Sequence, residues 1–212
     1  MAKKTTQSSD LKDRMDLFQI AQDGSRHIYE AALDDLRFVY NVDGGQWPDE
    51  VKAERKGRPM LTINKLLKFI RHLRGESRMN RPRMKVIPVD DQADPKKAEL
   101  YNGLIRQIEY LSNAEIAYDT AYLYAVSCSI GYFRIITQYE DEHSFNQEIR
   151  IKRIANPFSV LLDPSYDEFD SSDSKYGFVF DMISKKDFER DYPDVEPVDF
   201  KEQGKGQAHE GW

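Results

Sequence analysis

One segment of the chain concentrates positive charge. Between Lys52 and Lys85 there are twelve lysines and arginines but only two acidic residues, Glu54 and Glu76, which gives a local charge of +10. The whole chain has a net charge of −6, so the remaining residues together carry −16. A basic segment in an acidic protein either attracts a polyanion such as nucleic acid or pairs with acidic groups of the protein itself.

The basic residues fall on a predicted helix and on the arm that follows it. From Thr62 to about Arg78 the spacing is helical, with cations opposite an apolar stripe formed by Ile63, Leu66, Leu67, Ile70 and Leu73. We select eight cations as a candidate basic patch: Lys65, Lys68, Arg71, Arg74, Arg78, Arg81, Arg83 and Lys85.

A row of cations attracts phosphates without needing a fixed spacing, so this patch is compatible with nucleic-acid binding. It lacks the interleaved aromatic residues that stack on single strands, and no helix-turn-helix or zinc-finger pattern surrounds it. We therefore favour pairing of these cations with acidic residues, either within the subunit or across a subunit interface. Attraction to nucleic acid is the alternative.

An acidic segment at residues 163–175 is the second candidate site. It contains Asp163, Asp167, Asp170 and Asp173, and crowded carboxylates of this kind can hold Ca²⁺ or Mg²⁺. The glycine and glutamate of an EF-hand loop are absent, however. Asp173-Ser-Lys175 matches the Asp-x-Lys fragment of metal-dependent nucleases, but it lies in a serine-rich turn instead of on a strand. We expect a solvated or interface loop, with incidental cation binding and a nuclease as alternatives.

Sequence motifs of enzymes are not found elsewhere. The chain has no Gly-x-Ser-x-Gly motif, no phosphate-binding glycine-rich loop and no histidine pair with metal-ligand spacing. Cys128 is the single cysteine and lies in an apolar run, so an intrachain disulfide is impossible. We expect no catalytic residue, no metal and no cofactor. The N-terminus has no apolar region typical of a secretory signal.

Further helices are predicted before and after the basic segment. The first begins at Ser9 or Asp10 and runs to about Tyr40, with a possible break at residues 23–25. Asp94-Pro95 begins another helix, which ends near residue 112. Residues 114–130 are apolar on nearly all sides but are interrupted by acidic residues and fall short of the roughly 20 residues needed to cross a bilayer. This pattern predicts a buried helix, ended by Gly131 in the left-handed conformation.

Strands are predicted mainly in the second half of the chain. Residues 84–89 indicate a short strand, residues 133–139 and 148–152 a hairpin, and residues 158–162 and 176–183 two further strands. Ser184 and Asp187 form a capping box that opens a short helix. We predict an α+β fold in which long and buried helices pack on a small, mainly antiparallel sheet.

The predicted organisation is one domain flanked by two tails. Residues 1–9 are expected to be disordered, and residues 10–192 to form the domain, helical over 10–130 and β-rich over 131–192. Residues 193–212 offer little to bury and are expected to be a linker or tail, beyond which the native chain continues.

Taken in order, these elements resemble the N-terminal part of portal proteins from tailed double-stranded DNA bacteriophages, most of all those of short-tailed phages. The resemblance covers roughly residues 15–192. It rests on an ordered set of segments: a long charged helix, Trp47-Pro48, and residues 64–82, 84–91, 121–140, 148–164 and 170–178. The later segments that build the stem, clip and crown of such proteins are not in this chain.

The resemblance implies a structural role without catalysis. Portal proteins form a ring, commonly of twelve subunits, at one capsid vertex. Phage DNA passes through the ring, a terminase docks on it and tail adaptors attach to it. This chain would correspond to the peripheral wing region, located in the virion and, during assembly, in the host cytoplasm, with capsid proteins but no membrane as a partner. A heterologous interface in the ring would set the base of one subunit against the acid of the next. The alternative is a non-enzymatic nucleic-acid-binding accessory protein that uses residues 52–85.

Overall fold

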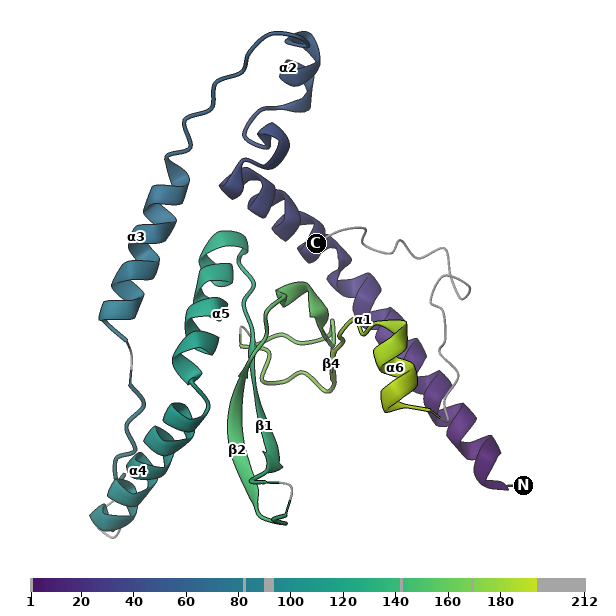
Figure 1. The fold of residues 1–212 in the computed structure, drawn as a ribbon, viewed down its shortest axis with the longest axis vertical. Helices are drawn as coiled ribbons and strands as arrows, with labels where there is room; N and C mark the ends of the chain where they lie inside the picture. Colours follow the sequence, from purple (N-terminus) through teal and green to yellow (C-terminus); the bar gives the residue numbers. More distant parts are fainter. Residues whose placement is uncertain (1, 82, 90–93, 142, 169, 194–212) are drawn as a thin grey trace. The chain divides into compact units, whose positions relative to one another are not determined.

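The computed structural model describes residues 2–81, 83–89, 94–141, 143–168 and 170–193 (Figure 1). The chain divides into two units, one up to Phe178 and one from Val179 onward. Helices combine with two small sheets, one of which is the antiparallel pair β1–β2, and this confirms the predicted α+β class. Most of the segment predicted to be a C-terminal tail, residues 194–212, lies outside the described residues.

Helix α1 (Ala2–Tyr40) is longer and more continuous than predicted. It begins at Ala2, before the predicted start at Ser9 or Asp10. The predicted break at residues 23–25 does not occur either. Gly24 instead allows a close contact, because a Cβ at this position would lie 2.5 Å from Cβ of Pro164.

Two short elements and a loop connect α1 to helix α3 (Leu66–Met79). They are the 3₁₀ helix η1 (Val42–Gly44) and helix α2 (Asp49–Glu54), which the sequence pattern did not indicate. Helix α3 begins later than predicted. The Asn64 side chain donates to the carbonyl of Val39 at 2.6 Å and accepts from the amide of Leu67 at 3.3 Å, which anchors the start of α3 to the end of α1.

The strand predicted at residues 84–89 is wrong. This segment has no strand partner among the described residues, and the Asn102 side chain bonds both backbone groups of Val86 instead, at 2.8 and 3.0 Å. Asn102 belongs to helix α4 (Pro95–Leu111), which begins as predicted: the Asp94 side chain accepts from the amide of Lys96 at 2.9 Å.

Helix α5 (Ala114–Cys128) is central to the first unit. It contacts α1, α3, α4, β1 and β2, which confirms the predicted buried helix. Its left-handed cap is Ser129, with φ of 66°, and not Gly131 as predicted. Glycine is needed at 131 for a different reason, since a Cβ there would lie 2.0 Å from the carbonyl oxygen of Ala121.

The sheets are two-stranded in the described part of the chain. β1 (Phe133–Tyr139) pairs antiparallel with β2 (Gln147–Arg153), with Phe133 opposite Arg153, so the predicted hairpin is confirmed. After the 3₁₀ helix η2 (Pro157–Ser159), β3 (Val160–Leu162) pairs with β4 (Gly177–Val179), both shorter than predicted. In the second unit the capping box at Ser184 begins α6 (Lys185–Asp191) as predicted.

The core of the first unit lies where α1, α5 and the segment 151–161 meet. Its buried residues form three clusters: Ala21, Tyr29 and Leu161; Ala32, Leu36 and Cys128; Ala114, Ala117 and Ile151. Helices α3 and α4 contribute far less, since each buries one residue, Ile70 and Ala98 respectively. Most of the apolar stripe that we predicted for α3 is exposed, including Leu66 and Leu73. On α4, Leu100 and Leu104 are exposed as well.

Candidate functional site

Three arginines of the basic patch bind acidic residues of α5. Arg74 and Arg78 both donate to the carboxylate of Asp119, with Nε–Oδ1 distances of 3.0 and 2.7 Å, and Arg78 adds a second bond to Oδ2 at 2.7 Å. Arg81 pairs with Glu115, one helical turn before Asp119. The two guanidinium groups hold the pKa of Asp119 well below its ordinary value, and the hydrogen bonds from Arg78 make the largest contribution.

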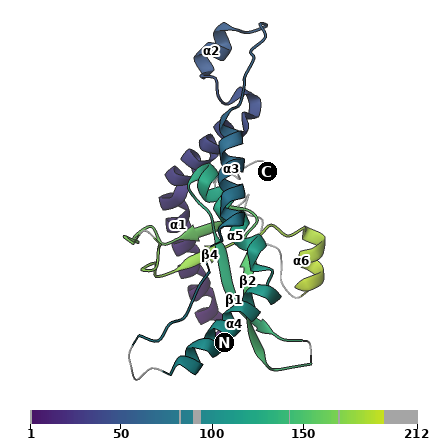
Figure 2. The same ribbon diagram turned by 90° about the vertical axis from the view of Figure 1, so that its left-hand side faces the viewer.

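These ion pairs fasten α3 to α5, which lie side by side in Figures 1 and 2. They also explain why Arg74 stands near the apolar edge of the helix: this position directs its side chain toward α5. Sequence reasoning missed Asp119 as the partner because it lies 45 residues from Arg74. Its only signal was an acidic residue inside an otherwise apolar helix.

Five members of the patch remain exposed: Lys65, Lys68, Arg71, Arg83 and Lys85. None of them has an ion pair with another residue that the structure describes. On α3 the exposed cations accompany exposed apolar side chains. Phe69 is 63% exposed, whereas the adjacent Ile70 is 4% exposed. We call Lys65, Leu66, Lys68, Phe69, Arg71 and Leu73 the α3 face.

The acidic segment is a loop whose carboxylates largely bind its own backbone. Asp163 is buried and accepts from the amide and the hydroxyl of Ser165 at 3.0 and 2.7 Å, which lowers its pKa. Asp173 accepts from the amides of Asp167 and Glu168 at 2.7 and 3.3 Å. We call residues 163–168 and 170–175 the acidic loop.

Within the described ranges, no group of three His, Cys, Asp or Glu side chains could hold a metal ion. Each oxygen of the Asp173 carboxylate accepts a hydrogen bond from one backbone amide of the same loop. Asp167 and Glu168 are exposed, and their carboxylates have no ion pair with the residues described.

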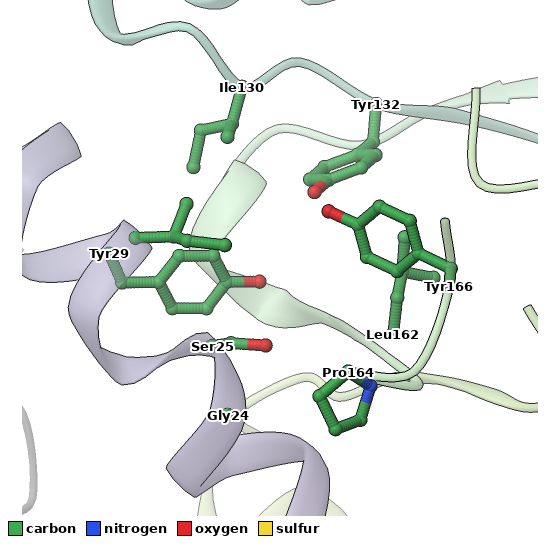
Figure 3. Close-up of a pocket in the computed structure, with 9 residues that line it drawn as sticks. Gly24, Ser25, Tyr29, Ile130, Tyr132, Leu162, Pro164 and Tyr166 are labelled. Carbon is green, nitrogen blue, oxygen red and sulfur yellow. The ribbon is translucent and has the colours of Figure 1, made fainter. Parts of the chain in front are cut away.

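A small cavity of about 250 Å³ lies between α1 and the start of the acidic loop (Figure 3). Tyr29, Tyr132 and Tyr166 line it together with Ser25, and the hydroxyl of Tyr29 donates to the carbonyl of Val160. Burial raises the pKa of Tyr29 and of Tyr132, so both phenols stay protonated and are poor nucleophiles. The cavity is smaller than usual ligand pockets of roughly 300–1,000 Å³. Sequence reasoning missed it, although Gly24 within a helix was a signal of close packing there.

The apolar helix α5 does not extend to membrane-spanning length. None of the helices in the described ranges combines the length and the apolar character that a bilayer crossing requires.

Comparison with known proteins places the chain in a family. A family model described as phage P22-like portal protein matches residues 15–212. A portal protein of Acyrthosiphon pisum secondary endosymbiont phage 1 is 28% identical over 185 residues, which cover 82% of this chain and 26% of that protein. The chain thus spans about a quarter of the length of this curated relative. Since the family match covers nearly the whole sequence, the chain belongs to the phage P22-like portal protein family.

Proposed function

We propose that this chain is a structural subunit of a phage portal ring at the capsid vertex. The ring would be the conduit for DNA packaging and ejection, and it would dock terminase and tail adaptors. The observation that carries this proposal is the family match over residues 15–212. About twelve copies would close the ring through heterologous contacts, because a head-to-tail interface generates a closed ring when its rotation fits.

Several charged groups of the described residues form structural contacts, which supports a structural role. Arg74, Arg78 and Asp119 fasten two helices together, while Asp163 and Asp173 fix a loop. The chain would act without a cofactor, in the virion and in the host cytoplasm during assembly. Its partners would be copies of itself, phage double-stranded DNA, terminase, capsid proteins and tail adaptors.

A nucleic-acid-binding accessory protein is the second candidate. The exposed cations Lys65, Lys68 and Arg71, which have no ion pair within the described residues, favour it. Such a protein would bind DNA as a monomer, and its affinity would fall steeply with salt because each neutralised phosphate releases counterions.

The two candidates are separated by measuring the mass of the intact gene product and imaging it in negative stain. A portal subunit gives closed rings whose mass corresponds to about twelve copies. A protein that stays monomeric at every concentration and binds DNA with a steep salt dependence is the accessory protein. Turnover of a substrate by the monomer would contradict both candidates.

A further inference from the structure

Among the described residues, the cations of the α3 face have no ion pair, and its apolar side chains are exposed. Lys65 is the N-cap of α3, and Lys68 and Arg71 follow at intervals of three residues within the helix. This spacing places the three cations along one side of the helix. Leu66, Phe69 and Leu73 have the helical spacing i, i+3 and i+7 and form an adjoining exposed stripe. An apolar stripe rimmed by cations has the composition of an interaction surface.

The acidic loop has the complementary charge, and its described residues are joined by hydrogen bonds. Asp167, Glu168 and Asp170 are exposed. Within the loop, Ser165 donates a hydrogen bond to Asp163, and two backbone amides donate to Asp173. A loop that is already ordered loses little conformational entropy on binding, so its carboxylates are well suited to receive cations.

The two surfaces do not neutralise each other within one subunit. Among the described residues there is no ion pair between the α3 face and the acidic loop, although both belong to the first unit. Helix α3 packs on α5 and the end of α1, whereas the acidic loop approaches α1 at Gly24. Because each chain carries both surfaces, every copy could offer one surface to each of two neighbours.

We propose that the α3 face of one copy binds the acidic loop of a second copy. This inference rests on the proposed portal function and assigns a specific contact to its ring. Charge complementarity fixes the orientation of the contact, and burial of Phe69 and its apolar neighbours stabilises it. Double-stranded DNA is a poorer occupant, since its phosphates would pair with the cations but leave Leu66, Phe69 and Leu73 exposed.

Two charge-reversal variants test the contact. The first, Lys68→Glu with Arg71→Glu, reverses the α3 face; the second, Asp167→Lys with Glu168→Lys, reverses the acidic loop. For each variant alone, the self-association constant measured by sedimentation velocity at low ionic strength should fall at least tenfold. An equimolar mixture should regain association with the two variants alternating. The unchanged loop of the first variant binds the unchanged α3 face of the second, and the two reversed surfaces also attract each other. A chain with all four substitutions should regain association.

The control for the first variant is Lys96→Glu with Lys97→Glu, which changes the net charge by the same amount at exposed positions of α4 and should leave association unchanged. Rings that persist in both variants would overturn this contact while leaving the portal function standing. Failure of the mixture to associate would overturn it as well. A wild-type chain that stays monomeric at low ionic strength and binds only DNA would overturn both proposals.

Discussion

The region around α1 and α5 and the region of α3 and α4 use the same sequence pattern with different results. Both contain helices with apolar residues at helical spacing. On α1 the chain covers this stripe itself, and Ala32 and Leu36 pack against Cys128. On α3 and α4 many of these apolar residues are exposed, as Leu73 and Leu100 show. Amphipathic spacing therefore indicates that a face favours burial, but not which chain buries it.

The two regions also differ in how polar groups hold them together. In the core region, the Tyr29 hydroxyl bonds a buried carbonyl and its ring packs edge-on against Phe158. Helix α3 contributes one buried residue, Ile70, and two of its arginines share Asp119 on α5. We expect the core to respond to changes in volume and the α3 region to respond to changes in charge.

The largest difference in the free energy of unfolding should be found between substitutions of two neighbouring residues of α3. Ile70→Ala should lower the free energy of unfolding by about 3 kcal/mol, because it leaves a cavity against the buried side of the helix. Phe69→Ala should change it by less than about 0.5 kcal/mol, because the ring is exposed. Urea unfolding of both variants measures the difference. Equal losses would show that the chain covers both faces of α3.

Two glycines test whether the backbone is closely packed near α5 and open on α3. Gly131→Ala should destabilise by about 1–3 kcal/mol, because its Cβ would overlap the carbonyl of Ala121 and force α5 and β1 apart. Gly75→Ala on α3 meets no atom within 4 Å and should stabilise by about 0.5–1 kcal/mol, since alanine favours a helix. Thermal melts of both variants check the opposite signs. A stabilising Gly131→Ala would contradict the close contact.

The arginine pair on Asp119 should be the main polar link between α3 and α5. Asp119→Asn should cost about 2 kcal/mol, because it removes charged hydrogen bonds to Arg74 and Arg78. Glu115→Gln is the matched control: its carboxylate is 72% exposed, so losing its pair with Arg81 should cost less than about 1 kcal/mol. Denaturant unfolding of both variants measures the two costs. Similar costs for the two variants would contradict the claim that Asp119 is the main polar link between α3 and α5.

The same carboxylate predicts a pH dependence. The pKa of Asp119 is lowered in the folded state, so its contribution to stability is complete above the unfolded-state pKa of about 3.9 and is lost as pH falls through the lower folded-state pKa. The stability gap between wild type and Asp119→Asn should be constant from pH 5 to 8 and narrow in acid below the unfolded-state pKa. The lowered pKa of Asp163 affects both proteins equally. A gap that widens in acid would contradict the assignment.

A smaller effect is expected from one hydroxyl in the core. Tyr29→Phe should cost about 1 kcal/mol, because the carbonyl of Val160 loses its buried donor. Tyr110→Phe, on an exposed ring of α4, should be neutral within about 0.5 kcal/mol. Urea unfolding checks both variants. A neutral Tyr29→Phe would mean that water replaces the lost donor.

Local signals allowed much of the fold to be predicted. Asp94 and Ser184 cap their helices as expected, because a cap depends on a few adjacent residues. The segment at Val86 was misassigned because a single distant side chain, Asn102, replaces a strand partner. Asp119 could not be identified as the partner of Arg74 because the two residues are 45 positions apart in the sequence. The basic patch was visible as composition, but its division into paired and exposed cations depends on tertiary structure.

The most direct test of this comparison is hydroxyl-radical footprinting of the assembled protein against the dissociated chain. We predict that Phe69 and Leu73 are oxidised in the dissociated chain and protected in the assembly, while Ile70 stays protected in both. Equal oxidation of Phe69 in both states would contradict the claim that the α3 face is covered by another copy.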